Sequence, residues 1–280
     1  LTTANIAVAQ NESGSLLPFA TFDQASEAVL NDPHDLVIGP DNRIYVADKF
    51  ANRIAVMDKE TLKLLDSFGE SELASPHDVD FDAQGRAIVA DTGNDRVAIF
   101  EFRDGKAQLV ESLSDGIFRP EGAVAHPNGR IYATGSGTGN IVAYENGKLV
   151  AQATGLSSAH DVEVDGEGNL WVADTFNQRI VKFSPDLQEL QTLEGPVYGW
   201  LGPRYLDIDK AGRLVVADQD AHRILLIEKD GSLVGVLGDG LPGAGPNKFD
   251  DPEGVDIWGP AYYFADSDNN RIVRYLLVTN

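Results

Sequence analysis

One sequence unit recurs six times along the chain, and this repetition limits the fold more than any other feature. The copies begin near residues 33, 76, 120, 159, 203 and 252, so successive starts lie 43, 44, 39, 44 and 49 residues apart. Most copies open with Pro and a polar residue, run into an alternating apolar stretch and, after a turn, end a second apolar stretch on Ala-Asp. A period of about 40 to 50 residues is typical of propellers and of a few helical arrays.

Each copy divides into short runs of β-branched and aromatic residues, separated by turn signals such as Asp41-Asn42 and Asn128-Gly129. These runs predict four strands in every unit. No stretch keeps the helical period over three turns, which excludes helical repeats. The sequence therefore predicts an all-β chain that forms a six-bladed β-propeller of four-stranded blades.

The two ends of the chain predict how the ring of blades closes. The sixth copy stops after its third strand at Val278, whereas residues 15–22 have the pattern of an outer strand and belong to no copy. Pairing these two segments would remove an open sheet edge. We expect residues 1–280 to form a single propeller domain in which residues 15–22 supply the closing strand of the last blade.

The charge of the chain bears on its partners. It has 22 Lys+Arg and 44 Asp+Glu, a formal net charge of −22. Such a surface repels polyphosphate and anionic lipid, so we expect neither nucleic-acid binding nor membrane insertion. We expect a monomer that acts on a small-molecule or peptide substrate. Because the chain opens at Leu1, we expect a processed protein that is secreted or periplasmic.

Five copies place an Asp and an Arg five residues apart, as in Asp48 and Arg53. We interpret these pairs as turn-closing contacts, because every blade needs the same turn. The third copy instead has Thr134 and the glycine-rich residues 135–139. No helix and no Lys-Ser/Thr pair follows that stretch, which argues against a phosphate-binding loop.

The repeats also carry a family pattern. Pro-x-Gly openings, as at Pro120 and Pro252, lead to Ala-Asp and then to Asn-Arg or Asn-x-Arg endings such as Asn52-Arg53 and Asn177-Gln178-Arg179. This pattern resembles the NHL-repeat family of propellers from residue 33 to the end of the chain. The resemblance implies the same six-bladed fold.

In a propeller the first strand of each blade lines the central channel, and its beginning lies near one mouth. Around the ring that position reads His34, His77, Glu121, His160, Arg204 and Glu253. Since the chain has no cysteine, a metal must be held by His, Asp or Glu. We predict Zn²⁺ or a similar divalent metal here, with the ligands His34, His77, His160, Glu121 and Glu253. The alternative is a water-filled channel lined by satisfied polar residues.

This arrangement is similar to that of the peptidyl-α-hydroxyglycine α-amidating lyases, six-bladed relatives of the NHL family with comparable Pro-His openings. The resemblance implies a catalytic zinc on three histidines of alternate blades, a deeper structural calcium, and Tyr and Arg residues that act on the substrate. His77 and His160 match two of the histidines, whereas Glu253 stands at the place of the third. By the same resemblance, the candidate calcium ligands are Asp35, Asp78 and Asp161.

Deeper in the same strands, the residue types also permit calcium binding. These positions read Asp80, Glu163, Asp207 and Asp256. Carboxylates with backbone carbonyls suit Ca²⁺. The alternative is that these side chains face neighbouring blades.

Two long loops, residues 194–201 and 238–251, lie beside blades five and six. We predict that Arg204 binds a substrate carboxylate and that Tyr205 or Tyr198 transfers a proton. We expect the wall of the site to consist of Trp200, Phe118 and Phe249. The alternative is a packed aromatic loop with a charged rim.

Three functions of different kinds remain open. A metal-dependent lyase acting on a small hydroxylated or peptidyl substrate is favoured. A calcium-dependent lactonase or esterase, as in the gluconolactonase and paraoxonase propellers, is the second. A non-catalytic NHL-type binding scaffold is the third, although the unusual residues gather inside the channel and not on a broad face.

Overall fold

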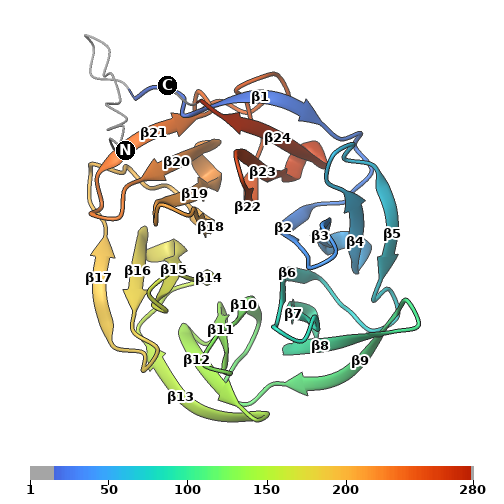
Figure 1. Ribbon diagram of the computed structural model, residues 1–280. Coiled ribbons are helices and arrows are strands. Elements are labelled where there is room, and N and C mark those ends of the chain that lie inside the picture. The colour runs from blue at the N-terminus through green and yellow to red at the C-terminus, as the bar shows by residue number, and fades with distance from the viewer. Residues whose placement is uncertain (1–15, 279–280) are drawn as a thin grey trace, which may run out of the picture.

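The computed structural model describes residues 16–278 as six four-stranded antiparallel sheets arranged radially around one axis (Figure 1). The predicted all-β, six-bladed propeller is confirmed. In the first three blades the strands run outward from the axis in the order β2 (Pro33–Ile38), β3 (Arg43–Asp48), β4 (Arg53–Asp58) and β5 (Leu64–Phe68); β6 (Pro76–Phe81), β7 (Ala87–Asp91), β8 (Arg96–Arg103) and β9 (Lys106–Leu113); and β10 (Pro120–Ala125), β11 (Ile131–Gly135), β12 (Asn140–Glu145) and β13 (Lys148–Thr154).

The other three blades repeat this order. They contain β14 (Ala159–Val164), β15 (Leu170–Asp174), β16 (Arg179–Phe183) and β17 (Glu189–Leu193); β18 (Pro203–Ile208), β19 (Leu214–Asp218), β20 (Arg223–Ile227) and β21 (Leu233–Leu237); and β22 (Pro252–Trp258), β23 (Ala261–Asp266), β24 (Arg271–Leu277) and β1 (Ala20–Ala25). Short 3₁₀ helices follow the second strand of every blade except the third: η1 (Lys49–Ala51), η2 (Thr92–Asn94), η3 (Thr175–Asn177), η4 (Gln219–Ala221) and η5 (Ser267–Asn269).

An N-terminal strand closes the ring, as predicted, but its range differs. β1 pairs with β24 through Ala20 and Leu277, and the two strands lie side by side at the ring closure (Figure 1). The strand begins at Ala20 and ends at Ala25, so both ends lie later in the chain than in the expected range of 15–22, of which residue 15 lies outside the described residues. The physical reason is that Pro18 has no N–H for a ladder, while the Leu17 carbonyl accepts the N–H of Val236 in blade five.

Apolar side chains fill the spaces between neighbouring blades. Tyr45 packs with Val89 of the next blade, and Trp171 packs with Leu214 in the same manner. Tyr132 and Tyr263 occupy the equivalent places in blades three and six. The prediction that these four aromatic residues pack between blades is confirmed, and each blade thus depends on its neighbours for its core.

The repeated Asp and Arg residues close turns, as predicted. The buried Asp91 carboxylate accepts a hydrogen bond from Arg96 Nε at 2.7 Å and another from the Ala74 N–H at 2.7 Å. The pairs in the other four blades have Arg Nε to Asp Oδ2 distances of 2.6 to 3.0 Å. Each Asp therefore ties the start of a 3₁₀ helix to the loop that enters its blade.

Within residues 16–278, no helix is both long enough and apolar enough to cross a membrane.

Candidate functional site

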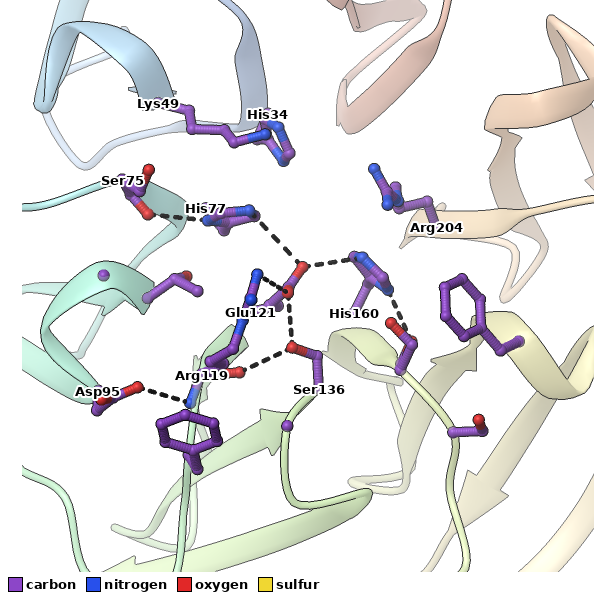
Figure 2. Close-up of a pocket in the computed structure, with 17 residues that line it drawn as sticks. His34, Lys49, Ser75, His77, Asp95, Arg119, Glu121, Ser136, His160 and Arg204 are labelled. Atoms are coloured by element: carbon purple, nitrogen blue, oxygen red, sulfur yellow. Dashed lines mark hydrogen bonds and ion pairs between the residues drawn. The ribbon is translucent and has the colours of Figure 1, made fainter.

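A cavity of about 810 Å³ opens at one mouth of the channel (Figure 2). His34, His77, Glu121, His160 and Arg204 line it, so five of the six ring positions face one space. The sixth, Glu253, is buried and contacts two of its lining residues.

The backbone explains why these side chains leave the sheet. The residue that precedes each inner strand has a left-handed conformation in five blades, with φ between 48° and 61° at Asp32, Ser75, Arg119, Ser158 and Asp251. The pairing of the inner strand with the next then shifts register immediately after its first residue in every blade. A bulge at this place re-aims the following side chain toward the axis.

One half of the ring is centred on Glu121. Its Oε2 lies 2.8 Å from His160 Nε2 and 3.7 Å from His77 Nε2, and Ser136 Oγ donates to its Oε1 at 2.6 Å. Burial favours the neutral carboxyl, but the two histidines and Ser136 outweigh burial and hold the pKa of Glu121 far below its usual range. Glu121 is therefore an ionised carboxylate.

The tautomers of both histidines are set by backbone carbonyls. His77 Nδ1 lies 2.8 Å from the Ser75 carbonyl oxygen, and His160 Nδ1 lies 2.7 Å from that of Ser158. A carbonyl can only accept, so each Nδ1 carries a proton and donates it. Nε2 of each ring is then directed at Glu121, and the 2.8 Å contact between His160 Nε2 and the ionised oxygen requires a proton, which a bound metal would replace. Burial, together with the neighbouring His34, lowers the pKa of His77 to about 3, so its Nε2 lone pair is free for a metal.

The other half of the ring is centred on Glu253. His34 Nδ1 lies 2.6 Å from Glu253 Oε2, and Arg204 Nη1 donates to Glu253 Oε1 at 2.9 Å. On its other side His34 Nε2 lies 3.4 Å from an oxygen of Asp32, which also pairs with Lys49 at 2.9 Å. Burial opposes protonation of His34, but Glu253 and Asp32 outweigh it and raise its pKa. The two carboxylates beside His34 therefore favour its protonated form.

The five expected metal ligands therefore form two groups and not one ring. Among residues 16–278, the ligand atoms of Asp32, His34 and Glu253 all lie within 4.8 Å of one another, whereas His77, Glu121 and His160 are more widely spaced. Both ring nitrogens of His34 and the Oε2 of Glu253 lack a hydrogen bond of good geometry. Asp32, His34 and Glu253 have the donor atoms that a divalent metal needs. Lys49 already pairs with Asp32, however, and Arg204 with Glu253.

Tyr205 does not line the cavity. Its side chain is completely buried, and its hydroxyl donates to the His77 carbonyl oxygen at 3.1 Å across the channel. Burial and the nearby Glu253 raise the pKa of Tyr205 well above its usual value. The expected proton transfer by this hydroxyl is not supported, because the hydroxyl is already engaged and lies outside the cavity.

Three other expected site residues lie in the core between blades. Tyr198 stacks on Trp200 with ring centroids 5.3 Å apart, and its hydroxyl donates to the Gly231 carbonyl oxygen. Phe249 is fully buried against Phe264. The predicted catalytic role of Tyr198 and the wall roles of Trp200 and Phe249 are wrong for this cavity, because apolar burial draws these large rings inward.

Phe118 does line the cavity and is half exposed. Sequence reasoning missed several residues that complete the site: Asp32, Lys49, Arg119, Ser136 and Gln219. These residues are hard to recognise from the sequence. They lie just after the second strand or just before the inner strand of a blade, and the residue types at those positions differ from blade to blade.

Below the ring lies a layer of acidic side chains. Asp35, Asp78 and Asp161 are all buried, and backbone N–H groups of neighbouring inner strands donate to Asp78 at 2.5 Å and to Asp161 at 2.7 Å. Burial raises the pKa of Asp78 to about 6, and burial with the neighbouring carboxylates raises those of Asp35 and Asp161 well above their usual values. These groups share protons or require a cation.

Comparison with known proteins agrees with this architecture. The family model described as NHL repeat matches residues 30–57 and 73–100, so the chain contains NHL repeats in blades one and two. A chicken protein, NHL repeat-containing protein 2, is 36% identical over 78 residues. That match covers 26% of this chain and only 11% of the chicken protein.

Solved structures share the fold at low identity. A streptogramin B lyase has a TM-score of 0.68 and 15% identity, covering 95% of this chain and 90% of its own. The catalytically inactive histidine-to-alanine variant of virginiamycin B lyase from Staphylococcus aureus, solved with quinupristin, has a TM-score of 0.68 and 14% identity, covering 91% and 99%. An auxiliary nutrient binding protein from Bacteroides thetaiotaomicron has a TM-score of 0.72 and 17% identity. The match covers 88% of this chain and 69% of that protein.

Proposed function

We propose that this propeller is a metal-dependent enzyme of the lyase type that acts on a small hydroxylated or peptidyl substrate in the cavity at the channel mouth. One observation carries the proposal. His77 and His160, with Nδ1 fixed by backbone carbonyls, direct Nε2 at the single carboxylate of Glu121 on the floor of that cavity. Two imidazoles and one carboxylate, with space above them, are the donor set of an open catalytic metal site.

The charges favour Glu121 over Glu253 as the metal ligand. Glu253 and Asp32 each have a Lys or Arg partner at 2.9 Å, and both carboxylates raise the pKa of His34 between them. Glu121 has no Lys or Arg partner as close, since Arg119 is 4.0 Å from it. Zn²⁺ or a similar divalent metal at His77, His160 and Glu121 would polarise a hydroxyl or carbonyl group of the substrate.

The remaining residues of the cavity have roles that their geometry allows. Arg204 keeps unused N–H donors, including a buried Nε without a partner, which can donate to a substrate carboxylate. The His34 imidazolium lines the same cavity and can give a proton to a leaving group. His34 therefore takes the role that the sequence assigned to Tyr205 or Tyr198.

A structural Ca²⁺ at Asp35, Asp78 and Asp161 is the second part of the proposal. A hard cation with oxygen ligands would neutralise carboxylates that burial otherwise forces to hold protons. The same acidic layer favours a calcium-dependent lactonase or esterase as the second candidate function. In that case lactone hydrolysis, and not bond elimination, should vanish with a calcium-selective chelator.

The test is the metal content of the dialysed protein, measured by elemental analysis after reconstitution with Zn²⁺. About one zinc per chain is expected in the wild type and in His222→Ala, whose histidine lies outside the cavity. His160→Ala and Glu121→Gln should lose it, by about 10-fold or more in affinity. Wild-type protein that retains no metal would overturn the proposal.

Activity separates the two candidate functions. Conversion of quinupristin, a peptidyl-α-hydroxyglycine and an aliphatic lactone should be followed by mass spectrometry with and without each metal. Products whose masses together equal that of the substrate, as bond elimination requires, support the lyase. A gain of one water, abolished by removal of calcium, supports the hydrolase.

A further inference from the structure

Blade three differs from the other five at the rim of the cavity. The others place a 3₁₀ helix after their second strand, whereas β11 ends at Gly135 and β12 begins at Asn140 with no 3₁₀ helix between them. Packing explains why glycine is required in this turn. A Cβ atom at Gly137 would overlap the ring of Phe118, so only glycine lets that ring lie on the turn.

Two exposed aromatic rings flank this part of the cavity. Phe118 comes from the loop before blade three and is 50% exposed, and Phe176 comes from η3 of blade four and is 71% exposed. Both line the cavity. Large apolar residues exposed singly are ordinary, but two that face one concave space provide a surface for a flat apolar group.

Three cations line the cavity of a chain whose net charge is −22: Lys49, Arg119 and Arg204. Asp32 and Glu253 lie 2.9 Å from Lys49 and Arg204 and offset the charge of those two side chains. Arg119 is therefore the cation that remains to attract an anion.

Arg119 is the cation best able to bind a ligand at the rim. Lys49 and Arg204 each have a carboxylate at 2.9 Å, whereas the nearest carboxylate oxygen to the Arg119 guanidinium is 4.0 Å away, on Glu121. Its side chain is 56% exposed, and it follows Phe118 directly. Figure 2 shows Arg119 extending toward Glu121 and Ser136, on the blade-three side of the cavity.

We propose that Phe118, Phe176 and Arg119, which line the cavity from blades three and four, form a subsite that binds an organic anion carrying a flat apolar group, of which an aromatic carboxylate is the simplest form. The proposal deepens the proposed function by naming the class of substrate. It does not depend on the metal, because none of the three residues is a proposed metal ligand.

The test is calorimetric titration of the chelator-treated, metal-free protein with 2-naphthoate, 2-naphthamide and 2-naphthylmethylammonium. Naphthoate should bind about threefold to fivefold more tightly than the neutral amide, and the difference should shrink at high salt. Arg119→Gln should remove that preference. Phe118→Ala and Phe176→Ala should each weaken binding of naphthoate about fivefold.

Matched controls come from the same chain. Phe50 is 59% exposed at the place in η1 that Phe176 has in η3, but it does not line the cavity, so Phe50→Ala should leave binding unchanged. Arg103, 61% exposed on blade two, is the control for Arg119. Equal binding of the three probes, no binding of naphthoate, or equal effects of Phe50→Ala and Phe176→Ala would overturn the subsite.

The outcome separates the subsite from the proposed function. Naphthoate binding with the expected variant effects, in a protein that takes up no metal, would leave the subsite standing and remove the lyase proposal. Metal uptake without selective naphthoate binding would do the reverse.

Discussion

At the scale of single residues, the site depends on the left-handed residue before each inner strand. Ser75 and Ser158 have φ near 50°, and their carbonyl groups accept from the Nδ1 atoms of His77 and His160. The strained backbone therefore sets the tautomer of the side chain two residues later. No sequence motif marks either serine, because the backbone carbonyl makes the contact and the serine side chain does not.

Glu253 gives a prediction at this scale. It is 1% exposed and contacts His34, Arg204 and Gln219 at once. Glu253→Gln leaves two cations buried without their carboxylate, so the free energy of unfolding should fall by about 2–4 kcal/mol. Urea unfolding at pH 7 measures this. Glu145→Gln, which breaks an exposed contact with Arg130, should change it by about 0–1 kcal/mol, and equal losses would contradict the prediction.

At the scale of elements, the repeated turn fixes how each blade enters the ring. Asp91 is inaccessible to solvent and accepts from Ala74, Asn94 and Arg96. Blade three lacks this carboxylate, and Thr134 there donates to the His160 carbonyl oxygen at 2.6 Å. Blade three thus lacks the turn and the 3₁₀ helix that the other blades share. In their place it has a contact with the backbone of His160.

Asp91→Ala should lower the free energy of unfolding by about 2–4 kcal/mol, because it leaves the partly buried Arg96 without its carboxylate and the Ala74 N–H without its acceptor. Chemical denaturation with fluorescence detection is the measurement. Asp186→Ala is the control, since that carboxylate is 87% exposed and 3.6 Å from Arg130. A loss below about 1 kcal/mol for Asp91→Ala would show that the turn is held by other contacts.

At the scale of the whole molecule, closure joins residues from the two ends of the chain. Phe19, just before β1, is 8% exposed and packs on Tyr262 and Gly235. Its carbonyl oxygen accepts the Val278 N–H. The segment therefore bridges blades five and six, and β1 pairs with the edge that β24 would otherwise leave open.

Phe19→Ala should lower the free energy of unfolding by about 3 kcal/mol, because it opens a cavity at the closure. Leu65→Ala, on the outer strand β5 where the side chain is 54% exposed, should have an effect within about 0.5 kcal/mol. Thermal melts of both variants compare them directly. Similar melting temperatures would mean that closure contributes little.

The acidic channel makes the stability of the molecule depend on pH. Burial raises the pKa of Asp256 to about 6, and burial with the Asp256 carboxylate raises that of Asp207 well above its usual value. Such groups bind more protons in the folded chain than in the unfolded chain. Their contribution is therefore fully present at low pH and is lost as pH rises from about 4 through the folded pKa.

Asp207→Asn should accordingly flatten the decline of unfolding free energy between pH 4.5 and 7, by up to about 1.4 kcal/mol per pH unit. Urea unfolding at four pH values, in chelator, measures the slope. The exposed Glu194→Gln serves as control. A steeper decline in Asp207→Asn than in the wild type would contradict the assigned direction.

The sequence by itself determined the architecture, because a blade is made by local patterns: a period near 44 residues, alternating apolar strands and a turn Asp with its Arg. It also placed His34, His77, Glu121 and His160 around one space, since every inner strand starts at the same step of the repeat. These features need only short-range rules; the strand pattern recurs in all six blades and the Asp–Arg turn in five of them.

Only the tertiary structure decided which ring residues pair. His160 lies against Glu121 of the neighbouring blade, His34 lies against Glu253 across the ring closure, and Tyr205 donates to the His77 carbonyl from the far side of the channel. Tertiary packing also buries Trp200 and Phe249 in the core. Register and burial across separate sheets are set by packing in three dimensions, and no local spacing in the chain encodes them.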